Sequence, residues 1–460
     1  MCSHTLFPSI GSRRSSGALL VGKMGNNGSM AAKWTNWAGN QIARPERILR
    51  PKSEQEVALL VAASTQRGQT VKVPGSGHSF TAAAVTDGVM IHISELSGIR
   101  SIDRTALTVT VGAGTTLSTL NELLAVEGLA LANMGDIAYQ TIAGAISTST
   151  HGTGVQLPGL AGQVRSFRLV LADGSVINCS PTKNPEIFDL ARVSLGALGV
   201  VVEYTLNVVE AFRLHAHEVP MRLDDVLNNI NELVATNDHF EFFWIPHTRW
   251  ALTKRNNRTE QPLAPLPKVR GWVEKTFMEN YAFGALCYLG RMRPSLIPKL
   301  ATALPSSGSR EYVNDSYKIF ASPRLVRFYE MEHALPAEHL PAALRDIVAM
   351  IDRKKYLLNF PVEVRFTAAD DVALSTSYGR VSAYIAVHIF KGMDFEPFFR
   401  DVEDIMRRYD SRPHWGKMHH RESGELANLY PRFNEFADLR NRLDPTRTFA
   451  NKYTRQVLGE

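Results

Sequence analysis

Cysteine is scarce in this sequence, and the few that occur form no pattern. Cys2, Cys179 and Cys287 lie far apart along 460 residues. Their spacing matches neither a metal-ligand motif nor a paired-disulfide framework, so we predict no metal site and no disulfide scaffold. We therefore expect a reducing compartment, either the cytoplasm or the lumen of an organelle.

Long hydrophobic runs and dense basic clusters are also absent. No uninterrupted apolar stretch approaches the roughly 20 residues that a membrane-spanning helix needs, so the protein is not expected to cross a membrane. The 51 basic and 45 acidic residues are mixed along the chain, which excludes the concentrated charge of a nucleic-acid surface. The formal net charge of +6 favours weak attraction to anionic substrates or membrane surfaces, so peripheral membrane association stays open.

Acidic residues are missing from the first 45 positions, which contain five basic residues and several serines. This composition overlaps that of an organelle transit peptide. A disordered leader or an overlong start explains it equally well, since Met24 and Met30 are alternative starts. The sequence becomes globular near Trp34, so we expect residues 1–33 to be a disordered or targeting leader.

The rest of the chain has the composition of a soluble globular protein, with 44% hydrophobic and 21% charged residues. At this length two domains, or three, are expected. Strand and helix patterns alternate from residue 48 to about 209, and the texture changes after about 211, where an aromatic run and a proline-rich stretch follow. These patterns predict a mixed fold of the α+β or α/β class.

Several elements stand out within that fold. A helix over 54–66 is predicted to begin after Ser53, a good N-cap residue. In the second half, apolar periodicity favours a sheet with helices on one side. The remaining predictions are strands over 72–74, 90–93, 201–208, 362–366 and 383–390, and helices over 340–352 and 395–409.

Three glycine-rich stretches are candidates for ligand binding. Residues 74–79 form a loop after a strand, where glycines let backbone N–H groups approach a phosphate or a flat ring. Residues 135–154 repeat small and hydroxyl side chains, which is typical of a bed for an extended cofactor. Residues 193–202 also repeat small residues, and close packing explains them as well as a wall for an adenine ring.

A nicotinamide-binding unit is the tempting alternative. Gly112-Ala113-Gly114-Thr115 follows a predicted strand and precedes a predicted helix. The third glycine of the dinucleotide fingerprint is missing, and no acidic residue closes a following strand at the expected distance. We therefore discount this interpretation.

Three motifs together resemble the gulonolactone and arabinonolactone oxidase family, which belongs to the vanillyl-alcohol-oxidase type of flavoenzymes. The motifs are residues 75–79, the stretch from Gly135 to Gly154, and Pro413-His414-Trp415-Gly416-Lys417. The resemblance implies an α+β fold of two domains, in which a PCMH-like FAD-binding domain joins a cap domain with an antiparallel sheet covered by helices. The expected bounds are 34–211 for the FAD-binding domain, 212–412 for the cap, and 413–460 for a segment that returns to the first domain.

The same resemblance implies FAD as the cofactor and His78 as the point of covalent attachment found in many relatives. Gly135 matches a small residue that admits dioxygen beside the flavin. The predicted cofactor-binding residues are Pro74, Gly75, Ser76, Gly77, His78, Ser79, Gly135, Asp136, Thr141, Gly144, Ser147, Thr150, His151, Gly152, Gly154, Gly199, Val200 and His414.

Four charged or titratable residues are the catalytic candidates. Alternation along a strand puts Glu363 and Arg365 on one face, and it points His388 away from an apolar layer. Lys417 follows the third motif. By residue type alone these are a surface salt bridge, a structural histidine and a solvated lysine, but the resemblance implies that all four surround the substrate above the flavin.

The implied reaction removes a hydride from the hydroxyl-bearing carbon next to a lactone carbonyl and passes it to flavin N5. Arg365 and Lys417 would stabilise the alkoxide-like transition state. Glu363 would orient Arg365 or hold a sugar hydroxyl, and either His388 or Lys417 would take the proton. The expected acceptor is O2, with a cytochrome or quinone as the alternative. Gulono-, galactono- and arabinono-lactones and open-chain alditols all remain candidate substrates, and the sequence predicts no oligomeric state.

A protein that binds FAD without catalysis and an NADPH-dependent flavin reductase are the two competing functions. The presence of all four catalytic candidates counts against the first. Bleaching of the flavin by NADPH would support the second.

Overall fold

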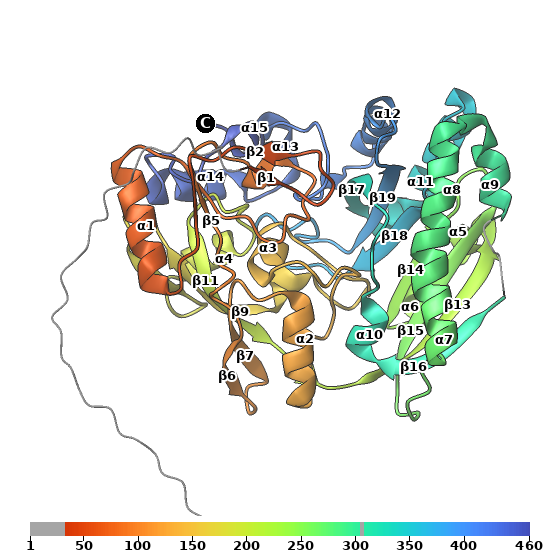
Figure 1. The fold of residues 1–460 in the computed structure, drawn as a ribbon, viewed down its shortest axis with the longest axis horizontal. Helices are drawn as coiled ribbons and strands as arrows, with labels where there is room; N and C mark the ends of the chain where they lie inside the picture. Colours follow the sequence, from red (N-terminus) through yellow and green to blue (C-terminus); the bar gives the residue numbers. More distant parts are fainter. Residues whose placement is uncertain (1–32, 304–307) are drawn as a thin grey trace, which may run out of the picture. The chain divides into compact units, whose positions relative to one another are not determined.

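The structure is a computed structural model that describes residues 33–303 and 308–460 (Figure 1). The predicted leader, residues 1–33, lies outside the described residues except for Lys33. The described residues belong to one compact unit. Within this unit two large hydrophobic clusters form separate cores.

The first core lies between small sheets and short helices. Helix α1 spans Glu54–Gln66 as predicted, and the Ser53 side chain accepts a hydrogen bond from the Glu56 N–H. A five-stranded antiparallel sheet runs in the order β10-β9-β11-β7-β6, and a three-stranded parallel sheet runs β3-β5-β4. Because β7 has antiparallel neighbours on both sides, the glycines at its end do not form a nicotinamide-binding βαβ unit.

The elements around this core have the following bounds. The strands are β1 Trp34–Thr35, β2 Ile42–Ala43, β3 Arg47–Leu49, β4 Val71–Lys72, β5 Val89–Ile91, β6 Ile99–Asp103, β7 Thr108–Gly112, β8 Leu129–Ala130, β9 Val164–Val170, β10 Val176–Cys179, β11 Val200–Asn207 and β12 Val209–Glu210. The helices are α2 Leu117–Val126, α3 Ile142–Ser147 and α4 Pro185–Ala191, with short 3-10 turns at Ala82–Ala84 and Leu160–Gln163.

The second core lies against an eight-stranded antiparallel sheet in the order β16-β13-β15-β14-β18-β19-β17-β20. Its strands are β13 Arg213–Arg222, β14 His239–Trp244, β15 Trp250–Thr259, β16 Arg310–Asp315, β17 Phe328–Pro336, β18 Val362–Thr367, β19 Ser382–Phe390 and β20 Arg412–Pro413. Helices α5 Leu223–Asn228, α6 Ile230–Ala235, α11 Leu340–Lys354 and α12 Glu396–Arg407 pack on one face.

Apolar and charged side chains alternate along β18, so one face of the sheet there is apolar and the other is charged, as the sequence predicted. Val362 and Val364 of β18 are buried in the second core, whereas Glu363 and Arg365 point to the opposite face. Near the β16 edge, the sheet is also covered by a long helix that the sequence did not reveal. This helix consists of α7 Lys268–Gly271, the π-helical segment η3 Trp272–Ala282 and α8 Phe283–Met292.

The C-terminal segment returns to the first core. Its helices are α13 Ser423–Leu429, α14 Phe433–Leu443 and α15 Lys452–Leu458, and their apolar residues join the first cluster. Figure 1 shows them beside β1 and β2. The Val71 N–H donates to the Thr448 carbonyl at 2.7 Å, and the Phe80 N–H donates to the Gly416 carbonyl at 2.7 Å. The domain boundaries themselves stay predictions.

Four short helical segments remain: a 3-10 turn at Pro294–Leu296, α9 Ile297–Ala303 beside α8, α10 Ser316–Phe320 after β16, and a 3-10 turn at Ala337–His339 that leads into α11. No helix in the described part of the chain is long and apolar enough to cross a bilayer.

Candidate active site

An open cleft lies in the first half of the fold, where the predicted glycine loops converge, and it measures about 1090 Å³ when the space open to solvent is included. Residues 74–79 line it throughout, together with Thr141, Gly144 and Ser147 of the second stretch and Gly199 and Val200 of the third. The third stretch therefore contributes a wall to the cavity, in addition to packing against the core.

The loop and the helix that follows fit closely at this cavity. A Cβ atom on Gly75 would overlap the Thr141 hydroxyl. The same hydroxyl accepts a hydrogen bond from the Gly144 N–H at 3.3 Å, so it caps the start of α3. Glycine at position 75 therefore lets two backbone segments form one wall without a side chain between them.

Sequence reasoning missed a lysine on the cavity wall. Lys72 is buried in β4, and its ammonium donates to the Phe449 carbonyl at 3.0 Å. Burial, and then the charge of Arg440, lower its pKa to about 7. Its only sequence signal was its position just before the glycine loop. The other lining residues that were not predicted are Trp34, Val71, Val73, Thr81, Ala83, Ala84, Ile93, Gln140, Ala143, Thr148, Ser194, Leu195, Gly196, Val201 and Phe449.

His78 marks the end of the cavity nearest the large sheet. Its ring stacks between those of Trp37, at 5.7 Å, and Tyr139, at 6.4 Å. Burial, and then the charge of Lys417, lower its pKa to about 4. The imidazole is therefore neutral at neutral pH.

Seven predicted cofactor residues do not line this cavity but lie between it and the large sheet. Gly154 donates its N–H to the Phe366 carbonyl at 2.8 Å, so it joins the loop to β18. A Cβ on Gly152 would overlap Asn133 and the Met134 carbonyl. The seven residues are Gly135, Asp136, Thr150, His151, Gly152, Gly154 and His414.

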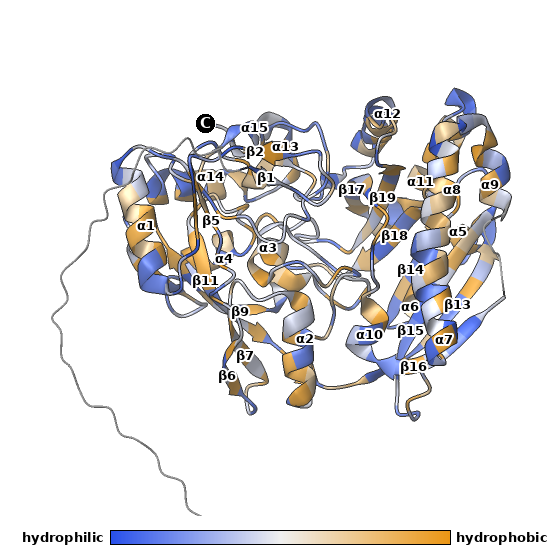
Figure 2. Cartoon of the chain, viewed as in Figure 1, coloured by the Kyte–Doolittle hydropathy of each residue, from blue (hydrophilic) through white to orange (hydrophobic). Residues whose placement is uncertain are grey.

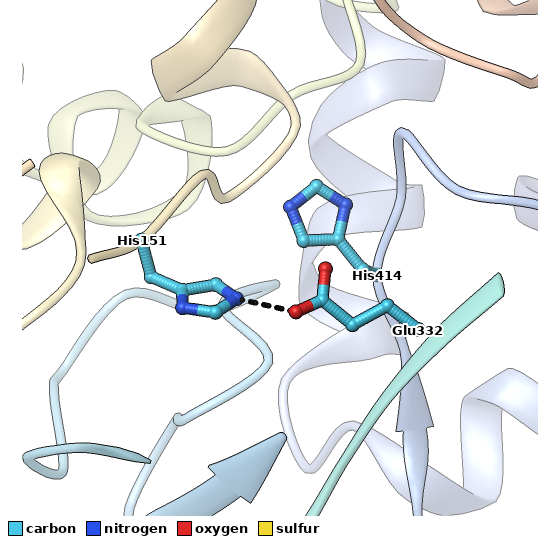
Figure 3. Close-up of side chains that lie close together, drawn as sticks. All are labelled: His151, Glu332 and His414. Carbon is cyan, nitrogen blue, oxygen red and sulfur yellow. Dashed lines mark ion pairs between the residues drawn. The ribbon is translucent and has the colours of Figure 1, made fainter. Parts of the chain in front are cut away.

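Two of these residues, His151 and His414, lie beside Glu332, and the three buried side chains come from distant parts of the chain (Figure 3). His151 follows α3, Glu332 lies on β17 and His414 follows β20, and their ligand-type atoms lie within 4.8 Å of one another. His151 Nδ1 is 2.9 Å from the Gly152 carbonyl, and Nε2 is 3.2 Å from Glu332 Oε1. These two contacts tie the glycine stretch to the sheet.

Arg365 lies at the centre of a buried ion-pair network on the sheet face that looks toward the cavity. Its guanidinium is 3.0 Å from Glu241 Oε2 and 3.1 Å from Asp136 Oδ1, and it also pairs with Glu363. Lys254 balances Glu241 at 3.2 Å. Three carboxylates therefore fix one guanidinium in place, and the exposed salt bridge that residue type alone favoured is wrong.

The carboxylates of this network differ in protonation. Burial opposes ionisation of Asp136, but Arg365 and Arg324 hold its pKa well below the usual range. Glu363 is different, because burial and the charges of Asp136 and Glu241 raise its pKa to about 7 despite Arg365. Arg324 Nε is 3.2 Å from Asp136 Oδ2, so Asp136 connects the glycine stretch to two arginines of the second half.

Glu330 connects the remaining two catalytic candidates. It pairs with Lys417, and its Oε1 lies 3.6 Å from His388 Nε2. Burial disfavours the Lys417 cation, but Glu330 and then Glu332 raise its pKa. The other nitrogen of His388, Nδ1, is 3.0 Å from the Pro361 carbonyl. Lys417 is thus a fixed cation, and His388 is oriented by backbone on one side.

All four catalytic candidates therefore lie in two neighbouring clusters, and sequence reasoning missed the residues that hold them. Glu330 and Glu332 alternate on β17 with Met331, which faces the apolar core. This alternation of acidic and apolar residues could have been recognised in the sequence. Nothing in the sequence indicated that Glu241, Lys254 or Arg324 would approach residue 365.

Comparison with known proteins identifies the architecture. A model of the D-arabinono-1,4-lactone oxidase family matches residues 204–457, and a model of an FAD binding domain matches residues 45–180. The chain belongs to the D-arabinono-1,4-lactone oxidase family. It is therefore an FAD-dependent oxidoreductase with the predicted flavoenzyme fold.

Full-length relatives and a solved structure agree with this assignment. L-gulono-1,4-lactone dehydrogenase of Mycobacterium tuberculosis is 44% identical over 431 residues, covering 94% of this chain and 100% of that protein. L-gulonolactone oxidase of Scyliorhinus torazame is 34% identical over 436 residues, covering 93% of this chain and 98% of that protein. The crystal structure of cholesterol oxidase from B. sterolicum superposes with a TM-score of 0.80 at 18% identity, covering 93% and 96% of the two chains, which shows a shared fold.

The residues around the cavity fit FAD. The space suits an extended cofactor. The Gly75 backbone packs against the Thr141 hydroxyl with no side chain between them, so the loop and the start of α3 form a continuous wall along the cavity. Hydroxyl groups of Ser76, Ser79, Ser147 and Ser194 surround the cavity and can donate to phosphate and ribose oxygens.

Proposed function

We propose that this enzyme oxidises a sugar-acid 1,4-lactone, of the gulono-, galactono- or arabinono- series, at the hydroxyl carbon next to the carbonyl. One observation carries the proposal. Two fixed cations, Arg365 and Lys417, share a buried sheet face with His388, close to the cavity end at His78. The names of the full-length relatives support the lactone as substrate.

The site residues would have the following roles. Bound FAD supplies the hydride acceptor at its N5 atom. Arg365 would face the oxygen on which negative charge develops, since Glu241, Asp136 and Glu363 already hold it in place and no reorganisation is needed. The raised pKa of Glu363 makes a protonated carboxyl available near neutral pH, which can donate to a sugar hydroxyl.

His388 is the better candidate for the base. Glu330 and Glu332 raise the pKa of Lys417, which therefore stays protonated and cannot accept a proton at neutral pH. If His388 donates from Nδ1 to the Pro361 carbonyl, the lone pair on Nε2 is free to take the substrate's hydroxyl proton. The Glu330 carboxylate, 3.6 Å away, would stabilise the imidazolium that forms.

The flavin would be attached covalently through His78. A neutral imidazole at the inner end of the cavity has the lone pair that bond formation requires. Acid denaturation of the purified protein tests this directly. The yellow colour should stay with the precipitated wild-type chain and pass into the supernatant for His78→Ala; release from the wild type would show that FAD is bound noncovalently.

We propose O2 as the electron acceptor, reached past Gly135. A Cβ at this position would lie 3.1 Å from the His151 carbonyl oxygen, so a larger side chain here would press against that backbone. A dehydrogenase that uses a cytochrome or quinone is the second candidate. It is favoured by the name of the relative that is 44% identical.

An anaerobic titration of the yellow protein with L-gulono-1,4-lactone tests the proposal. The flavin absorbance should bleach and then recover rapidly when air is admitted. Bleaching that persists in air would replace O2 with a separate acceptor. If no gulono-, galactono- or arabinono-lactone bleaches the flavin, lactone oxidation is wrong, and parallel titrations with an alditol and with NADPH would identify the alternatives.

A further inference from the structure

The helix formed by α7, η3 and α8 is apolar on its exposed side. Trp272, Tyr281 and Met292 are 55%, 57% and 62% exposed. Figure 2 shows white and orange turns along α8, at the outer margin of the large sheet. The exposed apolar side chains along the helix are Val269, Trp272, Val273, Phe277, Met278, Tyr281, Tyr288, Leu289 and Met292.

The inner side of the same helix is polar in its first half. Lys275 Nζ donates to the Tyr312 hydroxyl at 2.6 Å, and Asn280 Oδ1 accepts from the Leu325 N–H at 2.8 Å. Arg310 of β16 lies 3.2 Å from Glu274 and 3.1 Å from Glu279. The usual pattern of a surface helix, with its apolar stripe inward and its polar face outward, is therefore reversed here.

The π-helical geometry keeps the aromatic side chains together on the exposed side. Trp272, Phe277 and Tyr281 are spaced five and four residues apart, and their rings form a continuous stack with centroid distances of 6.0 and 6.4 Å. A regular α-helix would rotate residues five apart away from each other. Because π-helical insertions are concentrated at functional positions, this one indicates a selected surface.

The unbalanced charges around this apolar face are positive. The two acids on the helix, Glu274 and Glu279, pair with Arg270 and Arg310, and Arg310 also pairs with Glu218. Lys268, Arg293 and Lys299 are exposed and have no carboxylate partner among residues 33–303 and 308–460. An apolar, aromatic face with a basic rim is complementary to anionic lipid headgroups.

We propose that this helix face docks the enzyme onto the surface of an anionic membrane. The aromatic rings would lie at the level of the headgroups, where amphipathic side chains are favoured, and the basic rim would contact lipid phosphates. A second copy of the chain fits less well, because pairing two such faces would bring the same uncompensated cations together. The docking surface is a feature of the fold and does not depend on which lactone is oxidised.

Vesicle sedimentation of the full-length holoenzyme tests the proposal. The protein should pellet with vesicles that contain phosphatidylglycerol and remain largely in solution with pure phosphatidylcholine. Trp272→Ser/Phe277→Ser/Tyr281→Ser should partition about tenfold or more weakly, because three apolar anchors are lost. Lys268→Glu/Arg293→Glu should lose the preference for the anionic lipid and keep the flavin spectrum of the wild type.

A matched control uses exposed apolar residues elsewhere. Leu59→Ser/Val126→Ser removes side chains that are 64% and 85% exposed on α1 and α2, and it should bind vesicles as the wild type does. The proposal is overturned if the wild type ignores anionic vesicles, or if the control loses binding equally. It is also overturned if light scattering shows a dimer that only the triple variant abolishes, because the face would then bind a second copy.

Discussion

The cofactor cavity and the charged face of the large sheet differ in how they are built. The cavity wall consists of backbone, glycine and hydroxyl side chains, with Lys72 as a buried charge among its lining residues. The sheet face carries buried carboxylates around Arg365 and Lys417. The first region therefore selects by shape and by backbone hydrogen bonds, whereas the second holds two cations ready for a negatively charged transition state.

The largest effect is expected at the centre of the charged face. Arg365→Lys keeps the charge but loses the planar fork that spans Glu241, Asp136 and Glu363, so flavin reduction should slow by about 10²- to 10³-fold. Rapid-mixing absorbance under anaerobic conditions measures this rate. Arg408→Lys, in an exposed pair with Asp346, is the matched control and should reduce at the wild-type rate. An unchanged rate for Arg365→Lys would remove the guanidinium from the mechanism.

A side chain at position 75 should disrupt the shape of the cofactor cavity. Gly75→Ala places a Cβ against the Thr141 hydroxyl, so FAD affinity should fall by about tenfold or more. The FAD content of the purified protein, read from its absorbance, measures the loss. Adding Thr141→Ala should restore part of the binding. Gly424→Ala lies in α13 with no atom within 4 Å of its Cβ, so it should bind FAD normally. Full FAD content in Gly75→Ala would mean that the cavity wall can accommodate a Cβ at this position.

A substitution at Glu330 tests how the positive charge of Lys417 is stabilised on the sheet face. Glu330→Gln removes the main partner that raises the pKa of Lys417, so the alkaline limb of the kcat/KM profile should move to lower pH. The rate near neutral pH should fall by about tenfold. Glu311→Gln removes an exposed carboxylate on β16 that pairs with two histidines, and it should leave the profile unchanged. An unshifted alkaline limb in Glu330→Gln would assign that limb to another group.

The smallest expected effect is on the stability of the fold, and it comes from the opposite face of β17. His333 is fully buried there, and burial lowers its pKa to about 3. Since the unfolded side chain titrates near 6.5, its contribution to the free energy of unfolding is complete above that pH. The contribution is then lost, by up to about 1.4 kcal/mol per pH unit, as the pH falls toward 3. The stability difference between wild type and His333→Asn in urea should therefore shrink on acidification from pH 7 to 5. A constant difference would contradict a neutral, buried His333.

The cavity could be predicted from the sequence because its walls are local. Gly75, Ser76 and Gly77 belong to one loop, and the following stretch needs only its glycines and hydroxyls to be recognised as a ligand bed. Period-two alternation also predicted that Glu363 and Arg365 share a face. These inferences depend on neighbours within a few residues, which a single sequence contains.

The surroundings of Arg365 could not be predicted in the same way. Glu241 lies 124 positions earlier in the chain, and Asp136 lies much further away, in the glycine stretch. Alternation indicates which face a side chain occupies but not which strand lies beside it. Glu241 becomes a partner because β14 lies beside β18, and Asp136 because the glycine stretch packs against the sheet. The long helix over 268–292 was missed because its reversed polarity and π-helical segment break the period that identifies helices.

The most direct test of the central claim is flavin reduction by a lactone that carries deuterium on the carbon next to the carbonyl. The proposed chemistry breaks that C–H bond as the flavin is reduced. Anaerobic bleaching should therefore be several-fold slower with the deuterated lactone than with the unlabelled one, and the ketone product should lack the label at that carbon. Equal bleaching rates together with a product that keeps its deuterium would contradict the account, because the hydride would then come from another position.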